Sequence, residues 1–323
     1  MKHLIVFNEK AGSEKDAKEF KALVEKSFKG LDFEMHATTA PREAITFIKE
    51  FLKKNNKDTV RVYACGGDGT VHECANALVG FENAELAIYP VGTGNDFAKT
   101  YAGTKEYKEV VENRAAEKRL CDFPSLIKAE ARPIDLSKIS GASLKEPMYS
   151  INVINFGFDA IVGARGNYYK EHGVPANAPK KLQNDPYGYA LKNDAMKHGR
   201  FNDTVVIADG EQLNEKQILL GTLAQGQYVG GSFWCAPKSD NTDGLIDVCV
   251  LKTMTFLGLG MIIGPYTKGQ HLNKKRKKIV YRRAKEIEII APQEIDVCVD
   301  GEMIKGKEFK VECIKGAIKL AVF

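Results

Sequence analysis

The chain of 323 residues lacks the features that mark several common classes of protein. Its seven cysteines are scattered and never spaced as C-x-x-C, which argues against a disulfide framework and against a zinc ribbon. Its six histidines form no H-E-x-x-H motif and no cluster. No internal repeat and no low-complexity tract is visible. We therefore expect reduced cysteines, and expect any metal to be a hard cation bound through oxygen ligands.

Long apolar runs are also missing. The most apolar stretch, Phe256–Tyr266, has 11 residues, whereas a membrane-spanning helix needs about 20. The apolar run near Met1 is too short for a signal peptide and is typical of a first strand. We expect a cytoplasmic protein that touches membranes only transiently.

Positive charge is concentrated in one place. The net charge is +5, yet Lys268–Lys285 holds nine basic residues and no acidic one. This stretch is either a solvated surface or a patch that an anionic membrane attracts, at roughly 1 kcal/mol per basic residue. Charge alone would also allow nucleic-acid binding, but no nucleic-acid recognition motif is present, so we expect none.

The first 125 residues alternate short apolar runs with amphipathic helical patterns. Helices are expected from Ser13, from Thr39 and Pro41, and over Val71–Val79. Strands are expected at four places: Leu4–Phe7, Phe33–Ala37, Val60–Cys65 and Leu86–Tyr89. This alternation predicts an α/β fold with a doubly wound, mostly parallel sheet.

From about residue 130 short strands separated by turns dominate, which predicts a second, β-rich and sandwich-like domain. The expected strands cover seven segments: Tyr149–Asn155, Thr204–Ala208, Ile218–Ala224, Ile246–Leu251, Glu286–Ile290, Ile295–Val299 and Phe309–Cys313. A helix is expected over Tyr187–Lys197, and Tyr168–Pro186 is expected to form a loop or lid.

The strongest chemical signal is Gly66-Gly67-Asp68-Gly69-Thr70, directly after the third expected strand. Glycines at the carboxyl end of a parallel strand let backbone N–H groups approach phosphates, and the next helix N-terminus favours anions. The structural alternative is a tight turn in which Thr70 and Glu73 form a capping box. The segment is no Walker motif, because no G-K-[ST] follows.

A second glycine loop, Gly92-Thr93-Gly94-Asn95-Asp96, follows the next expected strand. Alone, Asn95 or Asp96 could be a helix cap. Two adjacent strand ends with glycine loops, however, make a crevice of the kind in which open α/β sheets bind ligands.

Together these two motifs resemble the catalytic domain of diacylglycerol, sphingosine and ceramide kinases and their soluble bacterial relatives. The resemblance covers essentially the whole chain. Asn8–Gly12 is similar to the N-P-x-x-G nucleotide loop of that family, with Glu9 in place of proline. In the second half, Asp240–Asp247 resembles a D-G-x-L-D segment, and Asp300-Gly301-Glu302 resembles V-D-G-E.

The resemblance implies ATP and Mg²⁺ as cofactors, and roles for residues at the matching positions. Asp68 and Asp96 would organise Mg²⁺ beneath the ATP phosphates. The nucleotide would contact residues of the loops and strand ends: Asn8, Gly12, Thr38, Gly66, Gly67, Asp68, Gly69, Thr70, Glu73, Gly92, Thr93, Asn95 and Asp96. Phosphoryl transfer depends mainly on positioning and charge neutralisation, which such residues supply.

In the second half, the resemblance makes Asp300 the general base, with Glu302 close by. Asp243, with the main-chain oxygens of Asp240 and Leu245, would hold a second, structural Mg²⁺. The structural alternative for Asp243-Gly244 and for Asp300-Gly301 is a hairpin turn, because Asp-Gly is a favoured hairpin dipeptide.

The resemblance predicts an ATP-binding domain over residues 1–125 and a lipid-substrate domain over residues 130–315. Gly316–Phe323 is expected to return to the first domain, with the site in the cleft between the two. The predicted activity is transfer of the ATP γ-phosphate to a lipid hydroxyl, with diacylglycerol as the first choice of acceptor. A kinase similar to NAD kinase or phosphofructokinase, or a non-catalytic lipid-binding protein, is the alternative. The sequence leaves the acceptor lipid and a homodimer open.

Overall fold

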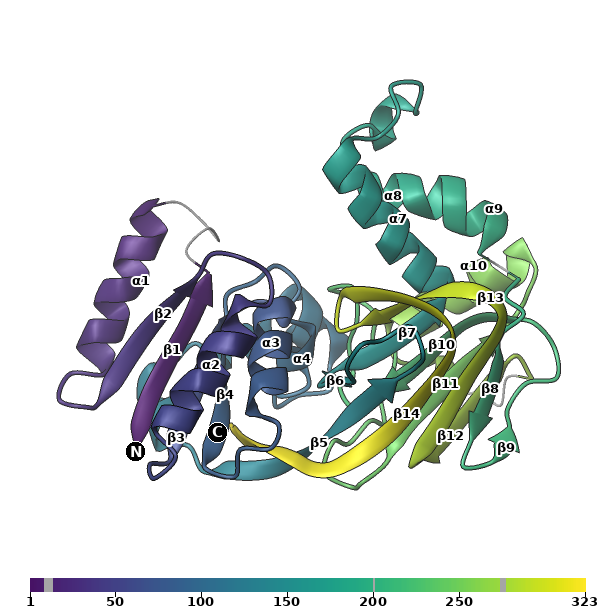
Figure 1. Cartoon of the computed structure of the whole chain (residues 1–323). Coiled ribbons are helices and arrows are strands. Elements are labelled where there is room, and N and C mark those ends of the chain that lie inside the picture. The colour runs from purple at the N-terminus through teal and green to yellow at the C-terminus, as the bar shows by residue number, and fades with distance from the viewer. Residues whose placement is uncertain (9–13, 200, 274–276) are drawn as a thin grey trace.

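The computed structural model describes residues 1–8, 14–199, 201–273 and 277–323 (Figure 1). The predicted nucleotide-loop residue Gly12, the predicted helix cap Ser13 and the basic residues 274–276 lie outside this part of the chain.

The first 130 residues form the predicted doubly wound α/β unit. Its parallel strands lie in the order β4-β3-β1-β2. The strands are β1 (Lys2–Asn8), β2 (Phe33–Thr38), β3 (Val60–Gly66) and β4 (Ala84–Pro90). The helices are α1 (Glu14–Ser27), α2 (Glu43–Lys54), α3 (Asp68–Leu78), α4 (Asp96–Lys99), η1 (Lys108–Glu112), α5 (Ala115–Leu120) and α6 (Phe123–Lys128).

Both faces of this sheet are covered, which explains the unbroken apolar runs of its strands. Successive residues of β3 point to opposite faces, so Val62 belongs to one hydrophobic core and Tyr63 to the other. Both side chains are fully buried. The sheet is therefore rigid at the carboxyl ends where the glycine loops begin.

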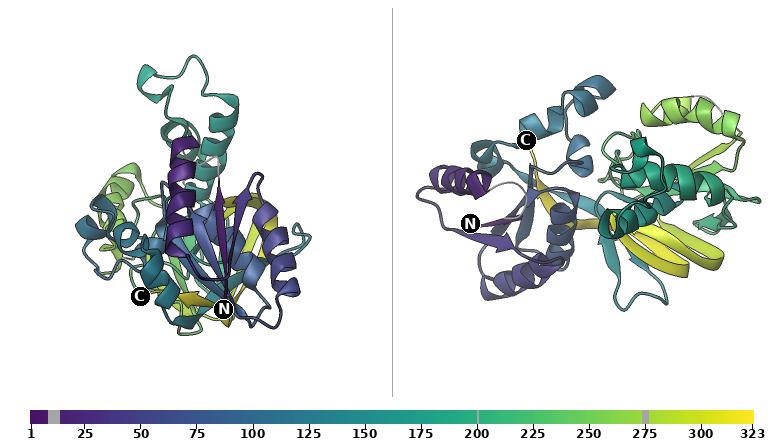
Figure 2. Two further views of the ribbon diagram at one scale, coloured as in Figure 1. Left: turned by 90° about the vertical axis from the view of Figure 1, so that its left-hand side faces the viewer. Right: turned by 90° about the horizontal axis from the view of Figure 1, so that it is seen from above.

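The second part is mostly antiparallel. Its strands are β5 (Ala131–Ser140), β6 (Met148–Ser150), β7 (Val153–Gly157), β8 (Val205–Ala208), β9 (Glu211–Gln212), β10 (Ile218–Ala224), β11 (Ile246–Lys252), β12 (Ile279–Ala284), β13 (Glu286–Val299) and β14 (Glu302–Ala321). Its helices are α7 (Phe158–His172), η2 (Lys180–Leu182), α8 (Pro186–Ala190), η3 (Leu191–Ala195), α9 (Met196–His198), α10 (Phe256–Thr267) and η4 (His271–Asn273). The segment α7 to α9 projects from the body of the molecule (Figures 1 and 2).

The long strand β14 joins the two parts into one sheet (Figure 2). Its first half pairs with β13 and its last residues pair in parallel with β4, where Leu320 lies opposite Leu86. Its pairing with β5 shifts register between Ile314 and Ile318, next to Gly316, whose φ is 61°. This bend lets one strand serve both parts. The domain boundaries themselves stay a prediction.

Two local predictions in the first part are wrong. Pro41 lies before α2, not in its first turn, because Arg42 at the N-cap has φ 65° and the helix begins at Glu43. The Thr70–Glu73 capping box does not form, because α3 begins at Asp68 with Gly67 as its N-cap. Glu73 instead accepts a hydrogen bond from the backbone N–H of Arg42.

Three predicted boundaries in the second part also change. The strand predicted over Tyr149–Asn155 is broken between β6 and β7, and the two strands predicted within residues 286–299 are one strand, β13, with a register shift. The predicted loop from Tyr168 begins only at Gly173, because α7 continues to His172. Gly173 has φ 86°, a conformation that ends a helix easily.

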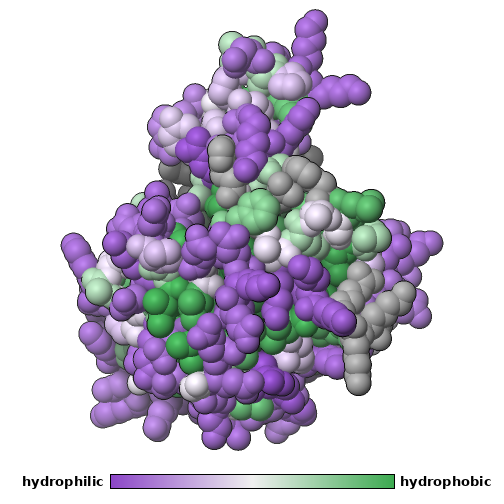
Figure 3. Space-filling model, turned by 90° about the vertical axis from the view of Figure 1, so that its right-hand side faces the viewer, coloured by the Kyte–Doolittle hydropathy of each residue, from purple (hydrophilic) through white to green (hydrophobic). Residues whose placement is uncertain are grey.

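The basic stretch forms an edge of the sheet, where β12 is the terminal strand. Arg282 pairs with Glu211, and Arg283 pairs with Asp243, so part of its charge is neutralised. Figure 3 views the molecule from this side and shows apolar patches between hydrophilic side chains. Among the described residues, no helix has both the length and the apolar character needed to span a bilayer.

Candidate active site

The two glycine loops lie against each other at the carboxyl ends of β3 and β4. The backbone N–H of Val91 donates to Gly66 O at 3.1 Å. A Cβ atom on Gly92 would lie 2.3 Å from Gly67 Cα. The two backbones therefore approach so closely that Gly92 has no room for a side chain.

The first loop leads directly into α3. A Cβ atom on Gly66 would overlap the side chain of Thr70, whereas one on Gly69 would meet no atom within 4 Å. Gly69 is exposed. Its backbone at the N-terminus of α3 is therefore open to an anion, which the free N–H groups of a first helical turn favour.

Asn95 braces the second loop from inside. Its backbone is left-handed, with φ 52°, and its side chain is buried. Its amide donates to Gly92 O at 2.7 Å and to Glu117 Oε1 at 2.9 Å, and its Oδ1 accepts from Gly92 N. Thr93, between these residues, is exposed. Asn95 thus shapes the loop, while Thr93 faces outward.

Asp68 and Asp96, one from each loop, form a pair of carboxylates. Burial raises the pKa of Asp68 to about 6, and the negative charge of Asp96 raises it further. Asp96 accepts from Lys99 Nζ at 2.9 Å and from the backbone N–H of Gly231 at 3.0 Å. Two close carboxylates with one lysine leave excess negative charge, which a divalent cation would neutralise.

Asn8 and Thr38 lie side by side, because they are register partners at the ends of β1 and β2. Thr38 Oγ1 donates to Phe7 O at 3.3 Å. Both therefore lie at the same edge of the sheet as the glycine loops.

Asp300 comes from the turn between β13 and β14, far along the chain. Asp300 and Gly301 both have positive φ, 51° and 101°, as in a tight hairpin turn. The turn that we considered as the structural alternative is therefore present, and it carries a specific set of hydrogen bonds as well.

The Asp300 carboxylate accepts five hydrogen bonds. The donors are Ser150 Oγ (2.6 Å), Asn152 N (3.0 Å) and Val153 N (3.0 Å) to Oδ1, and His72 Nδ1 (2.9 Å) and Ile151 N (2.9 Å) to Oδ2. The side chain is only 1% exposed. These backbone donors explain the break between β6 and β7, because their N–H groups point at the carboxylate and leave the strand ladder.

His72 brings Asp300 to the nucleotide loop. It lies on α3 one turn after Asp68, which is about 6 Å along the helix axis. Asp68 and Asp300, predicted to share a site, therefore lie close to the same stretch of helix. Glu302 lies beside them: it lines, with His72 and Glu73, a pocket of about 430 Å³ between α2, α3 and the segment before β6.

The Asp240–Asp247 segment forms a compact acidic turn. Asp243 Oδ1 accepts from Leu245 N at 2.9 Å, and its carboxylate pairs with Arg283. Asp240 Oδ1 accepts from the backbone and hydroxyl of Thr242. The buried Asp247 carboxylate receives no hydrogen bond in the described structure, and burial raises its pKa to about 7. An orphaned buried carboxylate fits a nearby cation, although Arg283 already supplies one positive charge.

Within the described residues, no group of three or more His, Cys, Asp or Glu side chains is arranged to hold a metal ion by itself. The Asp68–Asp96 pair and the Asp243 turn would thus need further ligands, from main-chain oxygens, water or nucleotide phosphates. Mg²⁺, which usually keeps several waters, accepts such incomplete protein sites.

Sequence reasoning missed three residues of this region: His72, Lys99 and Ser150. His72 lies in the segment that follows the first glycine motif, so its place on the α3 face was the available signal. Lys99 is three residues after Asp96, a spacing that predicts a helical ion pair. Nothing local in the sequence pointed to Ser150.

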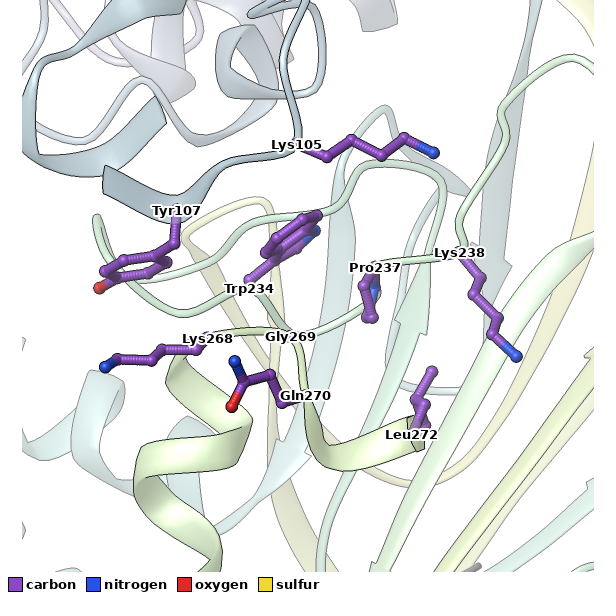
Figure 4. Close-up of a pocket in the computed structure, with 9 residues that line it drawn as sticks. All are labelled: Lys105, Tyr107, Trp234, Pro237, Lys238, Lys268, Gly269, Gln270 and Leu272. Carbon is purple, nitrogen blue, oxygen red and sulfur yellow. The ribbon is translucent and has the colours of Figure 1, made fainter. Parts of the chain in front are cut away.

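A second pocket, of about 360 Å³, lies where the two parts of the molecule meet (Figure 4). Tyr107 comes from the first part, and its hydroxyl donates to Ser232 O in the second. Three lysines line the pocket: Lys105, Lys238 and Lys268. Of the predicted basic stretch, Lys268 thus lines a pocket.

Two family profiles match the chain. Residues 2–139 match a profile described as the diacylglycerol kinase catalytic domain. Residues 152–322 match one described as the YegS C-terminal NAD kinase beta sandwich-like domain. The profiles cover both parts of the fold in the same order.

Named relatives agree with these profiles. The chain is 27% identical over 302 residues to the diacylglycerol kinase of Bacillus subtilis strain 168, covering 92% of this chain and 88% of that protein. It is 31% identical over 262 residues to "Probable lipid kinase YegS-like" of Pseudomonas aeruginosa strain UCBPP-PA14, covering 80% and 74%. A crystal structure of a diacylglycerol kinase from Bacillus anthracis strain Sterne has the same fold, with a TM-score of 0.66 at 23% identity, over 100% of this chain and 97% of that one. The chain belongs to the diacylglycerol kinase and YegS-like family of lipid kinases, which are phosphotransferases.

Proposed function

We propose that the protein transfers the γ-phosphate of ATP to the hydroxyl of a lipid alcohol, with diacylglycerol as the first choice of acceptor and phosphatidic acid as the product. The observation that carries this proposal is the junction at His72. There the loop suited to phosphates and the carboxylate suited to a hydroxyl come together from opposite ends of the chain. The diacylglycerol kinase name of a relative that matches over most of both chains supports the choice of acceptor.

In this proposal the glycine loops hold the triphosphate. Open backbone at Gly69 and the N-terminus of α3 would bind phosphate oxygens, and Thr93 would reach the nucleotide from the second loop. Asn8 and Thr38 would lie at the nucleotide edge. When bound, Mg²⁺ would neutralise phosphate charge, and Asp68 and Asp96 are the residues to hold it. Glu73 is less suited to nucleotide contact, since one of its oxygens accepts from Arg42 N.

Asp300 is the proposed base. The lipid O–H proton passes to a carboxylate oxygen, the hydroxyl oxygen bonds to the γ-phosphorus, and the bond from that phosphorus to the ADP oxygen breaks. Because all five donors occupy the carboxylate, the lipid hydroxyl has to displace one of them. The side-chain donors Ser150 and His72 can rotate away, whereas the three backbone donors cannot. Glu302, at the adjacent pocket, is the next candidate base.

We further propose that the membrane is approached through α10 and the basic residues after it. Leu257 and Met261 on α10 are 74% and 61% exposed, an apolar surface of the kind that enters a lipid interface. Lys268 follows this helix and lines the pocket shown in Figure 4. Weaker binding of Leu257→Ser/Met261→Ser to vesicles containing phosphatidylglycerol would support this surface, and unchanged binding would exclude it.

The test of the proposed activity is an assay with γ-labelled ATP. Lipid alcohols in mixed micelles are offered as acceptors, together with NAD and a sugar phosphate. Label in phosphatidic acid, or in another phosphorylated lipid, is the expected result. Label in NADP or in a sugar bisphosphate would favour the alternative kinases, and ATP turnover by none of the acceptors would favour a lipid-binding protein without catalysis.

A further inference from the structure

The contact between His72 and Asp300 joins two elements that are 228 residues apart in sequence. His72 lies on α3, which begins at the phosphate loop, and Asp300 lies on the β13–β14 turn. Both side chains are almost fully buried, with 5% and 1% exposed. A hydrogen bond so well shielded from water is a fixed part of the junction, and a charge on the ring would strengthen it.

The other four donors of Asp300 cannot change their charge. Three are backbone N–H groups and one is the Ser150 hydroxyl. His72 is the only one of the five that titrates near neutral pH. Burial opposes a charge on its ring, but the hydrogen bond and charge of Asp300 outweigh it, so the pKa of His72 is raised. Its protonation thus determines how tightly Asp300 Oδ2 is held.

We propose that His72 is a positioning residue for the transfer reaction: it holds Asp300 across the junction and, when its ring is neutral, yields Oδ2 to the lipid hydroxyl. This inference rests on the proposed function. A protonated imidazole makes a charge-assisted bond with which a hydroxyl competes poorly, whereas a neutral imidazole is a weaker donor. The site is thereby linked to α3, whose first turn carries the phosphate loop.

Other charged groups face His72 from every element around it. They are Glu73 on α3, Glu302 on β14, Arg42 and Lys49 at α2, and Lys145 and Glu146 before β6. The acidic Glu73 and Glu302 add to the effect of Asp300 and raise the pKa of His72. Substitutions at His72 should therefore be compared while these groups are kept intact.

The test uses two substitutions at His72 and one control. His72→Asn keeps a neutral donor close to the position of Nδ1, and His72→Ala removes the donor. The control is Asn76→Ala: Asn76 lies one turn further along α3 and makes a paired hydrogen bond with the backbone of Tyr149, at 2.8 and 2.9 Å. It contributes to the same junction without a bond to Asp300.

We expect kcat of His72→Ala to fall roughly 10- to 100-fold, the effect of one lost charge-assisted hydrogen bond, with a smaller change in the KM for ATP. His72→Asn should recover much of this rate. Wild-type kcat should rise with pH through an ionisation above 6.5 that both His72 variants lack, while Asn76→Ala should lower the melting temperature and keep the wild-type pH profile.

The inference is overturned if both His72 variants keep the wild-type pH profile of kcat, or if His72→Ala and Asn76→Ala behave alike. If wild type phosphorylates no lipid alcohol, the proposed function fails, and the junction is tested without activity. A double-mutant cycle of His72→Asn and Asp300→Asn in urea unfolding should then show coupling at pH 6 that weakens at pH 9. Absence of coupling at both pH values would refute the contact as a charge-dependent one.

Discussion

The two parts of the molecule present their aspartates in opposite ways. At the glycine loops, Asp68 accepts a hydrogen bond from Phe97 N and lies beside a second carboxylate, Asp96, so its pKa is raised. On the β13–β14 turn, Asp300 accepts five hydrogen bonds and has no exposed oxygen to speak of. The first environment has excess negative charge, and the second has its charge fully compensated.

This difference separates residues that wait for a ligand from residues that the protein has already positioned. A carboxylate pair with too few donors is stabilised when a cation binds. A carboxylate with five donors gains nothing from a cation, but it is held at one place with little freedom. We therefore assign metal and phosphate binding to the first part and proton transfer to the second.

The substitution expected to have the largest effect is Asp68→Asn, which should lower the transfer rate by roughly three orders of magnitude or more, because phosphate charge is left without its counterpart. Stability should respond in the other direction. Since the pKa of Asp68 is raised in the folded state, wild type loses stability as pH rises through about 6, and Asp68→Asn should lose less.

Urea unfolding between pH 4 and pH 8 without divalent cations measures this slope. A variant that unfolds with the same pH dependence as wild type would show that Asp68 is not in a charge-excess site, and the comparison between the two aspartates would break.

Two glycines sharpen the comparison within the first part. Gly92→Ala should reduce both activity and stability, by about 1–3 kcal/mol, because its Cβ atom would overlap Gly67. Gly69→Ala should keep the fold, since its Cβ atom meets nothing, yet weaken ATP binding, because that space is where phosphate approaches. Calorimetric titration with ATP and thermal melts of both variants check this, and tight ATP binding by Gly69→Ala would move the phosphates elsewhere.

The smallest effect on chemistry is expected for Asp243→Ala. It removes a hydrogen bond to Leu245 N and an ion pair with Arg283, so Tm should fall by about 2–4 °C, for about 1 kcal/mol. If the turn also holds a structural cation, the rise of Tm with Mg²⁺ should be weaker in the variant. An equal Mg²⁺ response in both proteins would leave Asp243 as an ion-pair residue alone.

The sequence was sufficient for the α/β unit and its glycine loops, because both depend on local signals. Apolar runs mark buried parallel strands, and glycines after a strand mark a close backbone approach. The reach of β14 from β13 to β4 was less visible, since its hydrophobic pattern is interrupted at the bend near Gly316. The break between β6 and β7 could not be predicted either, because it depends on Asp300, about 150 residues away.

The central claim is that both parts of the molecule build one transfer site, with nucleotide binding in the first and proton acceptance in the second. The most direct measurement is ATP affinity and the rate of γ-phosphate transfer to diacylglycerol in Asp300→Asn. We predict that kcat falls roughly 10²- to 10⁴-fold while ATP affinity changes little. Transfer at near wild-type rate, or loss of ATP binding in step with the rate, would contradict it.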